Sequence, residues 1–238
     1  MTGGAPLGAS FDPDRISALR PGPGNAPGTP PPGSRFTATR RTWSLAGVLT
    51  FAFLVLLYLI EFVDSMIDYC IDCTSGIEPR EVDGLDGILF APLLHGSWDH
   101  LLGNTLPVLI LGFLTLATGI RRGLAATAIV WIVAGVGTWL TGGTHTVHIG
   151  ASSLVFGWLT YLICRGWFAR QVGQIVLGLV VLVFYGSLLW GVIPGQDGIS
   201  WQGHLFGAMG GLFAGWVLSS DERRHRRQLR TGPLASPR

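Results

Sequence analysis

The chain has 238 residues, of which 48% are hydrophobic and only 13% are charged. A soluble globular domain carries about 25% charged residues, so this composition excludes an ordinary soluble domain and indicates a membrane protein. The formal net charge is +2 and the arginines are spread over loops and tails, which argues against nucleic-acid binding. Three cysteines are too few for a disulfide scaffold.

Residues 1–42 are expected to form a disordered cytoplasmic tail. The first 34 residues hold 8 of the 14 prolines and 7 glycines. Such a segment cannot bury enough apolar surface to offset the entropy of ordering it. It does not resemble a signal peptide, because the first apolar run begins only near Leu45.

Six apolar segments follow this tail and predict an all-α membrane domain over residues 43–220. They cover residues 45–63, 101–118, 124–140, 151–164, 175–192 and 204–218. Several are shorter than the ~20 residues that cross a bilayer. Small and aromatic flanking residues bring most of them to spanning length.

The arginines predict how these segments are oriented, because arginines beside short loops stay on the cytoplasmic side. They precede the first segment, lie between the second and third and between the fourth and fifth, and follow the sixth. The alternate loops hold one arginine, Arg80, and the loop over residues 64–99 is acidic. Six spans with both termini in the cytoplasm satisfy this pattern, with an Arg-rich cytoplasmic tail over residues 221–238.

Four polar side chains fall at the extracytoplasmic ends of three predicted spans, where such groups are costly and therefore indicate function. His100 and Asn104 begin the second span, Ser152 the fourth and His204 the sixth. At ~1.5 Å per residue, Ser152 and His204 both lie roughly 10 Å below the outer surface of a hydrocarbon core ~30 Å thick. The two residues can therefore be level.

A serine and a histidine at one depth predict nucleophilic catalysis, because a hydroxyl is a weak nucleophile until a base takes its proton. Ser152 begins a helix after the turn at Gly150, where unpaired backbone N–H groups can hold an oxyanion. His100 and Asn104 are four residues apart, so they project from one helical face and can add donors to that anion.

Two glycines are expected to bring the fourth and sixth spans together. Gly207 and Gly211 share a helical face with His204. Small residues at this spacing let a neighbouring helix approach closely. The fourth span could then come near enough for Ser152 and His204 to form a hydrogen bond.

Taken together, these motifs resemble the rhomboid family of intramembrane serine proteases. The resemblance rests on HGSWDHLLGN at residues 95–104, GAS at 150–152 and GHLFG at 203–207 with Gly211, in this order and on the matching spans. It implies a six-helix bundle with a water-filled cavity open to the extracytoplasmic side. The implied activity is a serine endopeptidase that cleaves transmembrane segments of single-span or multi-span membrane proteins, with no metal and no cofactor.

The resemblance also implies roles for individual residues. Ser152 is the nucleophile and His204 the general base of a dyad that has no aspartate. His100 and Asn104 stabilise the oxyanion together with the backbone N–H of Ser152. Structural roles near the site are implied for Gly150, Gly207, Gly211 and His95.

The chain departs from the usual family pattern at several positions. Ser153 follows the nucleophile where glycine is usual, and Gly203 precedes the base where alanine is common. The first loop lacks the frequent Trp-Arg pair. Ser153 adds a Cβ and a hydroxyl, which would tighten the site or shift the substrate pocket.

Two other functions are consistent with a polytopic membrane protein. One is a proteolytically inactive rhomboid-like protein that binds transmembrane helices; such relatives typically lack the serine or the histidine, and this chain has both. The other is a small transporter or channel. A cation carrier would place carboxylates within its spans, where this sequence has only Glu61. The expected location is a bacterial plasma membrane, with lipids and membrane-protein substrates as partners.

The outer loops hold further residues of possible chemical interest. His145 and His148 have metal-like spacing, but a metal site needs more ligands than these, so none is predicted. Cys70 and Cys73 lie in an oxidising outer loop, where a disulfide and two thiols both remain open. Cys164, at the inner end of the fourth span, is interpreted as a packing residue.

Overall fold

Helices make up almost all regular structure in the residues that the computed structural model describes, which are 32–67, 71–196 and 198–231, without the side chains of 32–38 and 221–231. Within these ranges there is no strand, and β-type pairing is confined to one antiparallel bridge between Ile77 and His148. The all-α prediction is confirmed.

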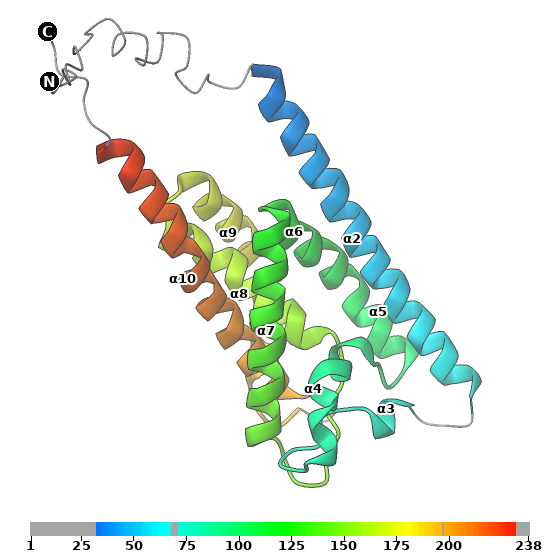
Figure 1. Cartoon of the computed structure of the whole chain (residues 1–238). Helices are drawn as coiled ribbons and strands as arrows, with labels where there is room; N and C mark the ends of the chain where they lie inside the picture. The colour runs from blue at the N-terminus through cyan, green and yellow to red at the C-terminus, as the bar shows by residue number, and fades with distance from the viewer. Residues whose placement is uncertain (1–31, 68–70, 197, 232–238) are drawn as a thin grey trace, which may run out of the picture. The chain divides into compact units, whose positions relative to one another are not determined.

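Each of the six predicted apolar segments falls on a long helical stretch (Figure 1). Helix α5 continues through the turn η3 into α6, and α9 continues into η4. The stretches are α2 (Pro32–Met66), α5 (Trp98–Pro107) with η3 (Val108–Gly112) and α6 (Phe113–Ala117), α7 (Ile120–Thr141), α8 (Ser152–Ala169), α9 (Val172–Tyr185) with η4 (Gly186–Val192), and α10 (Trp201–Thr231).

Four of these stretches are long and apolar enough to cross a membrane. They are Thr39–Met66, Trp98–Ala117, Ile120–Thr141 and Val172–Val192. Helices α8 and α10 are not among them in the described residues. Six membrane crossings therefore remain a proposal.

Both terminal helices extend into segments expected to be tails. Helix α2 begins at Pro32, before the expected boundary at residue 42, and α10 runs to Thr231. Proline suits the first turn of a helix, where its missing N–H would have no partner. Residues 1–31 and 232–238 lie outside the described residues.

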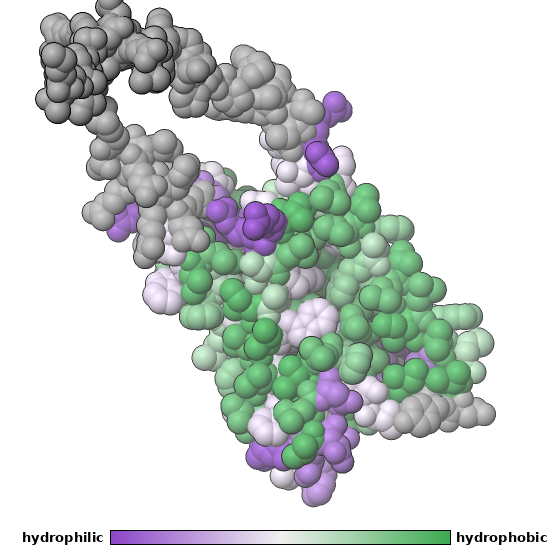
Figure 2. Space-filling model, in the orientation of Figure 1, coloured by the Kyte–Doolittle hydropathy of each residue, from purple (hydrophilic) through white to green (hydrophobic). Residues whose placement is uncertain are grey.

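In the compact unit that begins at Arg40, helix α8 is the central helix. It contacts α10, α9 and α7, and most of its side chains are buried. By contrast, α9 exposes large apolar side chains such as Val183 and Phe184, at 80% and 74%. Hydrophobic side chains cover the middle of the face seen in Figure 2, with hydrophilic ones gathered towards the ends of the helices. Because α8 is packed among other helices, it accommodates small and polar side chains.

Arg165, one of the arginines between the fourth and fifth predicted segments, is buried. Its side chain is 3% exposed, its Nε donates to Gln174 Oε1 at 3.1 Å, and its guanidinium lies 5.3 Å from the centre of the Tyr161 ring. Counting charges along the sequence cannot distinguish such a buried arginine from a solvated one.

Pro107 interrupts the second long helical stretch. It lies at the end of α5 and is followed by five residues of π-helix, η3. Proline lacks the N–H of the regular ladder and crowds the carbonyl four residues earlier, so the chain takes a wider turn there.

The loop between α2 and α5 contains α3 (Ile71–Thr74), η1 (Asp83–Leu85), α4 (Gly87–Phe90) and η2 (Ala91–Leu93). Arg80 Nη1 donates to the carbonyls of Leu140 and Gly142 at 3.3 and 2.8 Å, at the carboxyl end of α7. Trp131 Nε1 donates to the Ile88 carbonyl at 2.8 Å. The loop is therefore attached along α7 without the Trp-Arg pair that the family often has.

Candidate active site

Ser152 is the first residue of α8 and follows a turn at Gly150. Gly150 has φ 115°, a conformation that favours glycine, and its N–H donates to the Ala91 carbonyl at 2.8 Å. A Cβ at Gly150 would lie 2.7 Å from His100 Cε1. Glycine is thus required here both for the backbone conformation and for the close approach of the His100 ring.

His204 lies in the first turn of α10 and faces Ser152. Its Nε2 is 2.8 Å from Ser152 Oγ, and its Nδ1 is 2.9 Å from the Gly191 carbonyl oxygen. A carbonyl oxygen can only accept, so Nδ1 carries the ring hydrogen of the neutral imidazole. Nε2 then presents its lone pair to the Ser152 hydroxyl, as a general base requires.

A phenyl ring holds the imidazole from its face. Phe156 is stacked on His204 with a centroid distance of 4.0 Å and an interplanar angle of 9°. Phe156 lies one turn after Ser152 on the same side of α8, so this helix supplies both the hydroxyl and the supporting ring. The spacing of four residues was visible in the sequence, although it was not singled out.

Glycines allow α8 and α10 to approach each other closely. A Cβ on Gly207 would collide with the Ser153 carbonyl, and one on Gly211 with the Gly157 carbonyl. Thr160 Oγ1 also donates to the Ala208 carbonyl at 2.8 Å, which joins the two helices directly. The interhelical distance that brings His204 to Ser152 therefore depends on the absence of side chains.

His100 and Asn104 line the same cavity as Ser152. The backbone N–H of His100 donates to Ser97 Oγ at 3.2 Å, which caps α5. Asn104 is buried and its Nδ2 donates to the His100 carbonyl at 3.1 Å. The backbone N–H of Ser152 belongs to the first turn of α8, which has no intrahelical acceptor for it.

His95 supports this group from the loop before α5. It is 2% exposed, its ring lies 5.0 Å from the ring of His100, and its Nε2 accepts from the Ala151 N–H at 3.5 Å. Burial, together with the neighbouring His100, lowers the pKa of His95 to about 4. His95 is therefore neutral at physiological pH.

The four polar residues singled out in the sequence line one cavity of about 950 Å³. This volume lies at the upper end of the 300–1,000 Å³ typical of ligand sites. Gly191, Gln196 and Ile199, from η4 and the segment that follows it, line the same cavity. The acceptor on Gly191 belongs to the backbone, so no side-chain motif could have indicated it.

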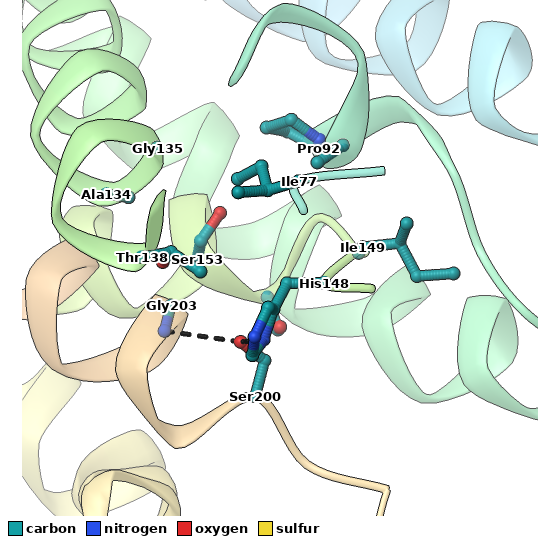
Figure 3. A pocket seen from close by; sticks show the side chains of 13 residues that line it. Ile77, Pro92, Ala134, Gly135, Thr138, His148, Ile149, Ser153, Ser200 and Gly203 are labelled. Atoms are coloured by element: carbon teal, nitrogen blue, oxygen red, sulfur yellow. Dashed lines mark hydrogen bonds between the residues drawn. The ribbon is translucent and has the colours of Figure 1, made fainter. Parts of the chain in front are cut away.

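Ser153 faces a second, smaller cavity of about 20 Å³, which it shares with Thr138, His148 and Ser200 (Figure 3). Its main-chain carbonyl, by contrast, lies against Gly207. The extra hydroxyl thus lies on the side of α8 that carries this small cavity. The wider cavity is not lined by Ser153.

The cysteines and loop histidines have other surroundings. Cys73 is disulfide-bonded and Cys164 is a free thiol, while Cys70 lies outside the described residues. His145 is exposed and has φ 60°, whereas His148 is buried. In the described part of the chain, no three His, Cys, Asp or Glu side chains gather closely enough to hold a metal ion.

A family model described as "Rhomboid domain" matches residues 84–221, more than half of the chain. The chain therefore belongs to the rhomboid family. With its long apolar helices, it is an integral membrane protein.

Related proteins are found in bacteria. An uncharacterized protein of Mycobacterium tuberculosis (strain H37Rv) is 48% identical over 204 residues, covering 82% of this chain and 85% of the relative. An uncharacterized protein of Mycobacterium leprae is 44% identical over 210 residues, covering 85% and 82%. A Bacillus subtilis protein named "Putative rhomboid protease YdcA" is 28% identical over 136 residues, covering 56% and 67%.

Proposed function

We propose that the chain is an intramembrane serine endopeptidase with Ser152 as nucleophile and His204 as general base. The observation that carries the proposal is the 2.8 Å bond between Ser152 Oγ and His204 Nε2, with Nδ1 committed to the Gly191 carbonyl. This is the neutral tautomer that can take a proton from a hydroxyl. The two residues also line a cavity of about 950 Å³, which could admit a substrate and which a purely structural hydrogen bond would not require.

The chemistry follows an acyl-enzyme route. His204 takes the Ser152 proton as the oxygen attacks the scissile carbonyl. The backbone N–H of Ser152 and the side chains of His100 and Asn104 stabilise the oxyanion. Collapse of this intermediate breaks the peptide bond, and His204 gives its proton to the leaving amine. Water, activated by His204, then hydrolyses the ester and restores the Ser152 hydroxyl.

The Gly191 carbonyl occupies the place that a carboxylate has in a serine triad. It fixes the ring orientation and receives the Nδ1 hydrogen, while Phe156 supports the face of the ring. A carbonyl carries no full charge, so it stabilises the imidazolium less than a carboxylate would. Because His204 must be neutral to act as a base, we expect activity to fall at acidic pH.

The proposed substrates are transmembrane segments of single-span or multi-span membrane proteins. We propose six spans with both termini in the cytoplasm and a cavity that opens to the extracytoplasmic side of a bacterial plasma membrane. The arginine distribution supports this orientation. The apolar surface of α9 and α2 supports contact with lipid and with an incoming helix.

The test uses purified wild-type protein in detergent and a fluorophosphonate probe that reacts with activated serines. We expect labelling that is lost in Ser152→Ala and in His204→Ala, together with loss of cleavage of a model transmembrane substrate. His145→Ala, at an exposed position of the outer loop, is the matched control for the histidine. A folded wild type that neither labels nor cleaves would overturn the proposal in favour of an inactive protein that binds transmembrane helices.

A further inference from the structure

His148 is a further histidine close to the proposed dyad and takes no part in its chemistry. His148 is 9% exposed and stands four residues before Ser152, in the turn that leads into α8. Its main chain pairs with Ile77 in both directions, N–H to carbonyl, at 3.0 Å each. The loop between α2 and α5 therefore holds the backbone of His148, while its side chain is available for other partners.

The imidazole of His148 bonds two hydroxyl groups. Its Nδ1 lies 2.7 Å from Ser200 Oγ and its Nε2 lies 2.9 Å from Thr146 Oγ1. Thr146 donates its one hydroxyl proton to the Gly143 carbonyl at 2.7 Å, so Nε2 must donate to Thr146 and carries the ring hydrogen. Nδ1 is then the acceptor for the Ser200 hydroxyl. Burial lowers the pKa of His148, in agreement with a neutral ring.

Ser200 connects His148 to the helix that carries the proposed base. Its Oγ accepts from the Gly203 N–H at 3.3 Å, as Figure 3 shows. Its carbonyl accepts from the His204 N–H at 3.1 Å. Ser200 thus caps the first turn of α10, and losing such a cap frays the turn that contains His204.

The bonds His148–Ser200 and Ser152–His204 run side by side between the same two segments. Each joins residues 52 positions apart, and each member of the first pair precedes a member of the second by four residues. Ser200 bonds the first turn of α10, so a shift of Ser200 that carries this turn away from His148 would also move His204 away from Ser152. His148 and Ser200, which have no reactive role, can therefore control the distance between Ser152 and His204.

We propose that His148 is a positioning residue that maintains the alignment of Ser152 and His204, by tying the turn before α8 to the first turn of α10 through Ser200. The inference rests on the proposed function, because alignment matters only if the two residues react. In this proposal His148, one of the two outer-loop histidines with metal-like spacing, bonds hydroxyl groups and binds no metal.

The experiment measures the rate of fluorophosphonate labelling of Ser152 in a set of variants. His148→Phe retains a ring but removes both bonds, and should lower the rate about tenfold or more, since small misalignments of reacting groups are costly. His148→Asn can place an amide oxygen near the position of Nδ1 and should recover most of the rate. His145→Phe, the same change at an exposed position, should label as the wild type does.

A double-variant cycle separates alignment from general damage. Ser200→Ala should slow labelling as His148→Phe does, and the double variant should be no slower than the slower single variant, because both changes break one tie. With a model substrate, the loss should fall on kcat at unchanged KM. If His148→Phe does not fold, the slow labelling expected of Ser200→Ala and the near-normal labelling expected of His148→Asn still test the proposal.

Several outcomes would overturn the inference. Wild-type labelling in His148→Phe would do so, as would multiplied losses in the double variant. If the wild type neither labels nor cleaves, the proposed function fails, and amide hydrogen exchange then decides whether His148 and Ser200 hold the two segments together. Unchanged exchange at Gly203 and His204 in His148→Phe would show that no tie exists.

Discussion

At the scale of single residues, His204 is held from three directions. The Gly191 carbonyl binds Nδ1, the Ser152 hydroxyl binds Nε2 and the Phe156 ring covers one face. A histidine with no carboxylate partner must be oriented by such contacts. Of these partners, Phe156 is a side chain with no direct part in the proposed chemistry, so its contribution can be tested alone.

Phe156→Leu should lower the rate of Ser152 labelling about two- to tenfold, which corresponds to the ~0.5–1.5 kcal/mol that an aromatic pair contributes beyond burial. The ring of His204 would then sample more orientations, although its two hydrogen bonds remain possible. The measurement is the labelling rate at a pH where the wild type is fully active. Phe213→Leu, on an exposed part of α10, is the control. An unchanged rate in Phe156→Leu would show that the two hydrogen bonds suffice.

His95 predicts how the stability of the protein depends on pH. Its pKa is about 4 in the folded protein, below the value of 6.5 for an exposed histidine. The unfolded chain therefore binds more protons between these values, and stability falls as the pH is lowered from 6.5 towards 4. The full contribution of His95 to this fall is on the order of 3 kcal/mol.

The test compares thermal unfolding of wild type and His95→Phe in detergent across this pH range. The variant should lose less stability on acidification, because one group that resists protonation has been removed. His145→Phe, at an exposed position, controls for the change of side chain. A variant with the wild-type dependence on pH would contradict the assignment to His95.

At the scale of elements, the approach of α8 and α10 controls the distance between the proposed catalytic residues. Gly207 and Gly211 lie against main-chain carbonyls of α8, so neither position has room for a methyl group. Backbone carbonyls cannot move aside as flexible side chains do. Any added atom must therefore separate the helices.

Gly207→Ala should destabilise the protein by about 1–3 kcal/mol, the usual cost of overpacking. It should also slow Ser152 labelling by about a hundredfold, since His204 lies one turn before Gly207 and would move with α10. Gly47→Ala, on α2, is the matched control, because a Cβ there meets no atom within 4 Å. Normal labelling in Gly207→Ala would mean that the helices can separate without disturbing the dyad.

At the scale of the whole molecule, the proposed six-span topology makes a prediction about access from each side of the membrane. Val82 is 76% exposed in the acidic loop, and Arg121 is exposed in the first turn of α7. In a Cys164→Ala parent, Val82→Cys should react with an impermeant maleimide in intact cells. Arg121→Cys should react only after the membrane is opened. The parent measures background reaction, and labelling of Arg121→Cys in intact cells would reverse or refute the topology.

The sequence located the helices well, because hydrophobic runs follow directly from the requirements of a bilayer. It also singled out Ser152, His204, His100 and Asn104, which the fold brings to one cavity. It could not indicate the Gly191 acceptor, which is a backbone atom, or the pairing of His148 with Ser200, which depends on tertiary structure. The burial of Arg165 was hidden for a related reason, since its partner Gln174 lies on the next helix.

The acceptor on Gly191 has a consequence for how this site can be inherited. Every amino acid carries a carbonyl, so no point mutation can delete the group that orients His204. What a mutation can delete is the space around it: a Cβ at Gly191 would lie 2.8 Å from Phe156 Cζ and 3.0 Å from His204 Nδ1. The sequence therefore specifies this acceptor only through the glycine at position 191, which leaves room for the His204 and Phe156 rings. A search for an acidic residue as the partner of His204 would not find it.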